Sequence, residues 1–211
     1  TPGSAVDAGS VLVTSLLPIS YLNLGAAGSV TIAAGSGTGD LLVANGLASD
    51  PLYSHLYVTS RSNNMVLRLD AATLGYQAEA AAGNQPWGVA VNPLTRRVYA
   101  GSFGTGELYV YDADTLARKA VVAVGPEPTF VDINTVTNKV LLVSHAADQL
   151  VVLNGATNTV ETTRATGGVG AWGLAVNPKL NYAYVAHRQS GGLVTLDGNS
   201  GWTPRQTITA C

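Results

Sequence analysis

The chain contains little cysteine, little charge and no long apolar run. Its one cysteine, Cys211, is the last residue, so no disulfide within the chain staples the fold. Charged residues make up 11% of the sequence and the net charge is −2, which excludes the basic surface that nucleic acid requires. The first Lys or Arg is Arg61, so the opening third lacks a polybasic membrane patch. No apolar run approaches the roughly 20 residues that span a bilayer, so we predict no transmembrane segment.

Helical periodicity is also missing from the sequence. No segment carries a sustained apolar stripe of helical period, and Gly, Asn and Asp interrupt the chain too often for helices of ordinary length. Gly, Ala, Ser, Thr and Val are abundant while Lys and Glu are scarce, a composition that suits an exported protein. We therefore expect an extracellular, periplasmic or cell-surface location.

One stretch recurs along the chain at a nearly constant spacing. The segment Gln85–Gly101, QPWGVAVNPLTRRVYAG, returns in altered form at Ala44–Ser60, Gly125–Val143 and Gly170–Ala186. The step from Asn92 to Asn134 is 42 residues, and the next step, to Asn177, is 43. A second marker, a turn that opens on Asp or Asn, keeps the same spacing and begins at Asp70, Asp112, Asn154 and Asp197. A period of about 40 residues built of short strands is the signature of a propeller blade.

Each repeat contains four predicted strands, which we call A to D in chain order. In the repeat that opens with Pro86 they are Trp87–Val91, Arg97–Gly101, Leu108–Tyr111 and Arg118–Val124. Pro93 ends the A strand because proline cannot donate to a ladder. We predict an all-β protein with one domain over residues 1–211, a β-propeller of four-stranded antiparallel blades. Its five repeats of 42–43 residues lie approximately at 1–41, 42–85, 86–127, 128–170 and 171–211.

The repeat resembles the YVTN family of β-propellers. The family's namesake B strand is matched by Leu56–Ser60, LYVTS, and its A strand by Pro86–Pro93, PWGVAVNP. Its C strand and turn are matched by Val66–Thr73. The resemblance implies the fold and is nearly silent on function, because one fold hosts many functions. It also implies six to eight blades, so we expect the five repeats to belong to a larger propeller, with an unusually small propeller as the alternative.

The loops between strands D and A and between B and C are expected to share one face of a propeller. Its candidate ligand residues are Trp87, Trp172, Arg61, Phe103, Arg188 and Asn84. The two tryptophans hold equivalent positions in their repeats. They could stack on a ligand, or they could pack as wedges between adjacent blades, and their recurrence favours the second role.

The same face carries a weaker set for a divalent metal ion or for acid–base catalysis. His145 and His187 lie one position apart in the B–C loops of neighbouring repeats, and Glu127 is expected near them in a D–A loop. The competing interpretation, which we favour, treats these as solvated loop residues that share no centre. Asp197–Gly201 carries oxygen ligands at alternate positions, as a calcium loop does, but it stands where the ordinary C–D turn is expected. His55, in an A–B turn, is expected on the surface of the opposite face.

These observations favour a binding function over catalysis. No local hydrolase, zinc or haem signature accompanies the repeat, so we predict no catalytic residue and no cofactor. The leading hypothesis is a secreted or cell-surface module that binds or scaffolds a protein or glycan partner. The first alternative is a metal-dependent propeller lyase or lactonase that uses His145, His187 and Glu127. The second is a structural subunit of a surface or redox multiprotein assembly, in which another chain supplies further blades or a covering subunit.

Overall fold

The computed structural model describes residues 44–209, and nearly all of its regular structure is β-strand. Sixteen strands form four antiparallel sheets of four strands each. This confirms the predicted propeller architecture for the described repeats, while the expected repeat over residues 1–41 and Cys211 lie outside the described residues. Within residues 44–209, no helix is long and apolar enough to cross a membrane.

Each sheet is one repeat, with its strands paired in chain order. The first described blade consists of β1 (Ala44–Asp50), β2 (His55–Ser60), β3 (Met65–Asp70) and β4 (Tyr76–Ala81). The second consists of β5 (Pro86–Asn92), β6 (Arg97–Ser102), β7 (Glu107–Asp112) and β8 (Arg118–Ala123). The third consists of β9 (Pro128–Asn134), β10 (Lys139–Ser144), β11 (Gln149–Asn154) and β12 (Thr159–Ala165). The fourth consists of β13 (Ala171–Asn177), β14 (Tyr182–His187), β15 (Gly192–Asp197) and β16 (Thr203–Thr209).

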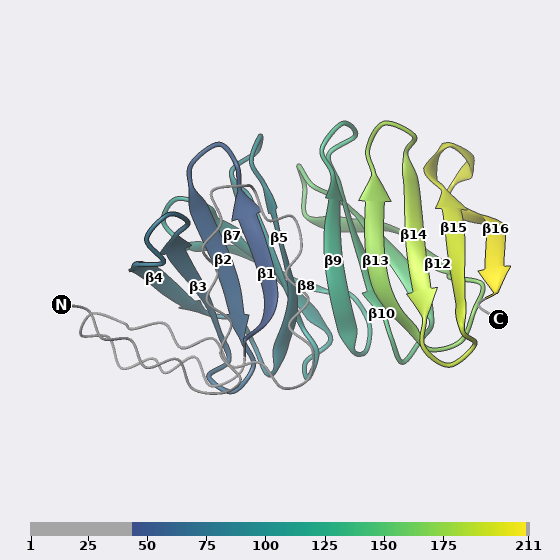
Figure 1. Cartoon of the computed structure of the whole chain (residues 1–211), viewed down its shortest axis with the longest axis horizontal. Coiled ribbons are helices and arrows are strands. Elements are labelled where there is room, and N and C mark those ends of the chain that lie inside the picture. The colour runs from purple at the N-terminus through teal and green to yellow at the C-terminus, as the bar shows by residue number, and fades with distance from the viewer. Residues whose placement is uncertain (1–43, 210–211) are drawn as a thin grey trace.

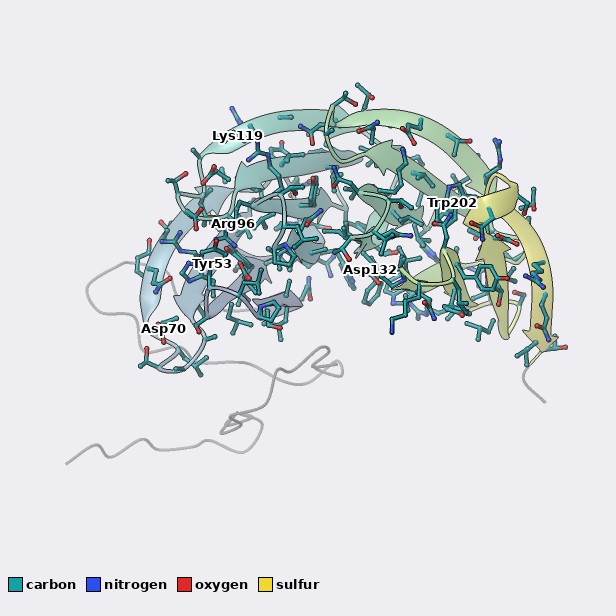
Figure 2. The ribbon with its side chains drawn as sticks, turned by 90° about the horizontal axis from the view of Figure 1, so that it is seen from above. Tyr53, Asp70, Arg96, Lys119, Asp132 and Trp202 are labelled. Atoms are coloured by element: carbon teal, nitrogen blue, oxygen red, sulfur yellow. The ribbon has the colours of Figure 1, made fainter. Side chains whose placement is uncertain are left out.

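The blades stand side by side along an arc. The inner strands β1, β5, β9 and β13 lie next to one another in that order (Figure 1). Seen from above, the described part of the chain forms an open arc, and the blades at its two ends have no common boundary (Figure 2). The arrangement explains why the inner strands are rich in small residues, because the blades converge there.

Glycine on the inner strands permits this convergence. A Cβ atom added at Gly46 would lie 2.3 Å from the carbonyl oxygen of Trp87, on the neighbouring inner strand. At Gly88 the added atom would lie 2.3 Å from the carbonyl oxygen of Thr129, again one blade further on. Neither approach is open to a residue with a side chain, so glycine is required where the backbones of these blades come this close.

Between the blades, apolar side chains fill the widening gap. The interface between the β5–β8 and β9–β12 blades is made mainly of branched aliphatic side chains around one tyrosine, all with at most 7% of their surface exposed: Ala90, Tyr99, Leu108, Val110, Val131, Ile133, Val140, Leu142, Val151 and Leu153. The Tyr99 hydroxyl lies 3.4 Å from the Gly155 carbonyl of the next blade. Tyr57 repeats the pattern one blade earlier, donating to the Ala113 carbonyl at 2.8 Å. Burial raises the pKa of both tyrosines, which keeps their hydroxyls protonated as donors.

The C–D turns form as the sequence predicts. The Oδ1 atom of Asp70 accepts hydrogen bonds from the backbone N–H of Ala72 at 3.0 Å and of Thr73 at 2.8 Å. These bonds and one from the Thr73 hydroxyl lower the pKa of Asp70, since they favour the charged form. Asp197 accepts from the N–H of Asn199 at 2.8 Å and opens a single 3₁₀ turn. The segment considered as a calcium loop therefore has the bonding of an ordinary C–D turn.

Polar side chains link successive blades at the A–B turns. Asn92 donates from Nδ2 to Oδ1 of Asn138 at 3.0 Å, and Asn134 donates in the same way to Asn181 at 2.8 Å. At the equivalent place one blade earlier, Asp50 forms an ion pair with Arg96.

The surface expectation for His55 was wrong. Its ring is half-buried beside Tyr57, with the ring centroids 6.3 Å apart, and burial lowers the pKa of the imidazole.

Replacing Gly88 by Ala tests the contact between inner strands. We expect Gly88→Ala to lower the free energy of unfolding by about 1–3 kcal/mol, because the added methyl group overlaps the backbone of β9. Gly173→Ala is the matched control, since its added Cβ meets only the Ala186 methyl group at 3.4 Å. Urea denaturation of the two variants compares them directly. Equal losses in both would contradict this role of Gly88.

Candidate ligand-binding face

Backbone hydrogen bonds bring the D–A and B–C loops to the same end in the last three described blades. The N–H of Phe103 donates to the carbonyl of Gln85 at 3.0 Å, and the N–H of His145 donates to that of Glu127 at 2.9 Å. In the last blade Arg188 donates to Gly170 at 2.8 Å. In these three blades the B–C loop is thus fixed to the D–A loop that precedes it. The face expected from the sequence is therefore present in these blades.

Four aromatic rings form a row on this face. Trp87 packs against Phe103, with ring centroids 5.6 Å apart, and against Trp172 edge to face at 5.3 Å. Trp172 in turn meets the His145 ring edge to face at 4.9 Å. Both indoles are half-buried. Since contacts of this geometry stabilise beyond their buried area, the row is a preformed apolar surface.

The contact between the two tryptophans differs from the favoured wedge interpretation. Trp87 is on β5 and Trp172 on β13, so their contact joins blades that are not neighbours. The intervening strand β9 carries Thr129 at the equivalent position. Its small side chain is bonded through Oγ1 to the Trp172 carbonyl at 3.0 Å. The small Thr129 between two tryptophan positions was the signal in the sequence that the indoles can meet, and the sequence prediction did not use it.

An arginine lies over each tryptophan. The guanidinium carbon of Arg61 is 5.1 Å from the centroid of the Trp87 ring, and that of Arg188 is 4.6 Å from the centroid of Trp172. Arg61 also donates to the side-chain oxygen of Gln85 at 3.0 Å. Among residues 44–209, neither arginine is ion-paired to a carboxylate. Each of the two indoles in the row therefore has a positive charge beside it.

We call this set the Trp–Arg cluster, and it contains Arg61, Trp87, Phe103, His145, Trp172 and Arg188. Asn84, the remaining candidate, is exposed and has a different role. Its carbonyl oxygen accepts from the N–H of Gly104 at 2.9 Å and from the Ser102 hydroxyl at 2.8 Å. It shapes the loop that holds Phe103.

The candidate metal ligands have separate surroundings. His187 is buried, and its Nε2 lies 2.9 Å from the Thr166 hydroxyl. The Nδ1 atom of His145 lies 2.9 Å from the Ala171 carbonyl. Glu127 is half-buried. Its contact with His145 is a backbone one, in which the Glu127 carbonyl accepts from the backbone N–H of His145. Across the described part of the chain, no group of three or more His, Cys, Asp and Glu side chains could hold a metal ion.

Comparisons with known proteins show the fold. No family model matches the sequence, so the YVTN resemblance stays a prediction. No curated protein matches it either. Among solved structures, Kuenenia stuttgartiensis hydrazine synthase is similar with a TM-score of 0.74 and 18% identity, over 83% of this chain and 51% of that chain.

A second solved structure, the dihydro-heme d1 dehydrogenase NirN in complex with DHE, is similar with a TM-score of 0.67 and 20% identity. The match covers 80% of this chain and 37% of that chain. This chain therefore spans about half, or less, of the length of the proteins it matches. At such identities the likeness shows that this chain has the fold of a β-propeller.

Proposed function

We propose that this chain is a non-catalytic binding module whose partner docks on the Trp–Arg cluster. The partner is a protein that presents acidic side chains. The observation that supports this most is the continuous row Arg61–Trp87–Trp172–Arg188, in which two indoles in edge-to-face contact are flanked by two guanidinium groups.

The residue types suit a protein interface. Trp and Arg dominate the hot spots of protein–protein contacts, where a few large side chains carry most of the binding free energy. The half-buried indoles are held in place by their own ring contacts, so little side-chain entropy is lost when a partner covers them. Each guanidinium can bind a carboxylate in a bidentate manner. A neutral glycan could stack on Trp87 and Trp172, but it has no carboxylate to pair with the two guanidinium groups. This difference favours a protein partner.

The metal-dependent lyase or lactonase gains no support from the described residues. Such an enzyme would need His145, His187 and Glu127 around one centre. Instead, one imidazole is bonded to the Thr166 hydroxyl and the other to the Ala171 carbonyl. Binding at the Trp–Arg cluster requires no metal ion.

A second candidate function is a subunit of a redox multiprotein assembly outside the cytoplasm. The two similar solved structures are named as a hydrazine synthase and a dihydro-heme d1 dehydrogenase, and the second is a redox enzyme by name. The sequence composition supports export. In this role the Trp–Arg cluster would be the contact with a neighbouring redox subunit.

Substitutions in the cluster should weaken partner binding. We expect Trp87→Ala or Trp172→Ala to raise the Kd by at least about 30-fold, or about 2 kcal/mol, because each removes a hot-spot side chain. Arg188→Glu should weaken binding further at low salt, since it reverses the charge that meets the acidic partner. The partner is first captured with the purified chain from envelope and secreted fractions of the source organism. Its affinity is then measured by calorimetry.

Arg118→Glu is the matched control for charge, because Arg118 is exposed on the outer strand β8, away from the cluster. It should leave the Kd unchanged. Each variant is accepted only if its urea midpoint matches that of the unmodified chain. Full binding by the combined Trp87→Ala, Trp172→Ala and Arg188→Glu variant would refute the proposed face.

The redox assembly makes a separate prediction about the captured protein. We expect the complex to carry a cofactor that absorbs visible light, while the isolated chain does not. A visible absorption spectrum of the captured complex, recorded before and after addition of dithionite, checks this. A colourless complex with no spectral change on reduction would argue against the redox role and leave the binding role intact.

A further inference from the structure

The residue directly before Trp172 is held at both of its backbone polar groups. Ala171 is fully buried, and its N–H donates to Oδ1 of Asp148 at 2.7 Å. Its carbonyl oxygen lies 2.9 Å from Nδ1 of His145, and since a carbonyl can only accept, the imidazole is the donor. Asp148 and His145 belong to one B–C loop, in which the Asp148 N–H donates to the His145 carbonyl at 3.3 Å. The start of β13 is therefore fixed by a loop of the preceding blade.

The strand that carries Trp87 has a similar contact one residue earlier. The residue directly before Trp87 is Pro86, which has no N–H to donate. The N–H of Gln85 donates instead to Oδ1 of Asn64 at 2.8 Å, again in the B–C loop of the preceding blade. Both tryptophans are thus carried by strands whose start is bonded to a side-chain oxygen of the blade before.

Asn64 and Asp148 hold the same position in their blades, and the blade between them has Gly106 there. In each case the backbone carbonyl accepts the N–H of the first residue after strand D, which is in turn Ala82, Thr166 and Val124. All three positions have a left-handed backbone, with φ of 58°, 52° and 71°. Gly106 has no side chain to offer, and the inner strand that follows it, β9, carries Thr129 in place of a tryptophan.

The carbonyl of each tryptophan is held in the same selective way. Thr59 donates from Oγ1 to the Trp87 carbonyl at 2.6 Å, and Thr129 donates to the Trp172 carbonyl at 3.0 Å. Both threonines are fully buried. Gly101 holds in β6 the position that Thr59 holds in β2, so it can offer no hydroxyl to β9. The two strands with tryptophan are therefore bonded on both sides of the indole, by side chains that the blade between them replaces with glycine.

We propose that Asn64 and Asp148 are positioning residues that set the two indoles of the Trp–Arg cluster for partner binding, a role that rests on the binding function proposed above. Each side-chain oxygen fixes the backbone just before its tryptophan, and a threonine hydroxyl fixes the carbonyl just after the side chain. The indoles are then held in their edge-to-face contact before a partner arrives. A surface ordered in this way loses less conformational entropy on binding.

The left-handed backbone decides which substitutions are informative at these positions. Glycine, asparagine and aspartate tolerate this conformation, whereas alanine is strained in it and loses stability for an unrelated reason. Asp148→Asn keeps an oxygen acceptor and copies the arrangement found at Asn64. Asp148→Gly removes the acceptor without strain and copies the arrangement found at Gly106. The two variants therefore differ in the acceptor and share a permitted backbone.

Binding of the captured partner should follow the acceptor. We expect Asp148→Gly to raise the Kd by about 10-fold or more, because the buried Ala171 N–H loses its acceptor and Trp172 is no longer fixed. Asp148→Asn should keep the Kd within about twofold of that of the unmodified chain. Asn158→Gly is the matched control, since Asn158 also has a left-handed backbone, with φ of 57°, but lies in the C–D turn of the same blade. It should leave the Kd unchanged.

The same pair of substitutions applies to the other indole. Asn64→Gly should raise the Kd, while Asn64→Asp, which keeps the oxygen, should not. Because Asn64 is exposed, its loss costs the fold less than the loss of Asp148. Asn64→Gly therefore tests the same role even where Asp148→Gly is too unstable to purify.

Near-ultraviolet circular dichroism measures the indole contact without any partner. The coupling between the two rings is obtained from a double-mutant cycle of Trp87→Phe and Trp172→Phe, in which the signal of the buried Trp202 cancels. We expect the glycine variants to reduce this coupling and Asp148→Asn to retain it. All spectra are recorded well below the urea midpoint of each variant, so that only folded chains contribute.

The two measurements separate this positioning role from the binding function. Unchanged coupling in both glycine variants, or an equal loss in Asp148→Gly and Asp148→Asn, would overturn the positioning role. Reduced coupling with an unchanged Kd would retain the positioning role and refute binding through the indoles. Reduced coupling together with a raised Kd, both restored in Asp148→Asn, is the result that supports the two proposals.

Discussion

The close approach of neighbouring inner strands is the constraint on which the rest of this structure depends. At Gly46 and Gly88 the backbone of one blade lies where a Cβ atom would otherwise be, against the carbonyls of Trp87 and Thr129. Strands this close at the inner edge must diverge toward the outer edge, since each sheet is four strands wide and twisted. Tyrosine and branched aliphatic side chains fill the resulting wedge. The curvature of the arc therefore follows from where the small and large residues stand along each blade.

The same convergence creates the candidate site. Loops at the ends of the inner strands are brought together from several blades, so side chains distant in the chain can meet. Trp87 and Trp172 meet because Thr129, between them, is too small to separate the indoles. The places of the two guanidinium groups follow from the strands before them. Arg61 and Arg188 each begin a B–C loop, and each of these loops starts beside one of the two indoles. The cluster is thus a product of all four described blades, although each blade alone contributes an ordinary loop.

The sequence predicts the strands and turns because these depend on local patterns that recur with every blade. Strand D of the second described blade, expected at Arg118–Val124, is found as Arg118–Ala123, and the turn at Asp70 has the expected hydrogen bonds. The contacts of the site depend on loop geometry and side-chain rotamers that no period encodes. His145 and His187 occupy nearly equivalent positions in the alignment. One nevertheless packs on an indole while the other is buried beside Thr166.

Strand β14 connects the core of the last blade to the Trp–Arg cluster. The strand ends at His187, which is buried with its Nε2 atom 2.9 Å from the Thr166 hydroxyl, and it leads directly into Arg188. The backbone N–H of Arg188 is itself bonded to the Gly170 carbonyl at 2.8 Å. The guanidinium over Trp172 is therefore carried by a backbone that is fixed on both sides of the strand end. A loop ordered in this way loses less entropy when a partner binds, which is why the position of His187 matters for the affinity of the face although its ring makes no contact with the cluster's indoles.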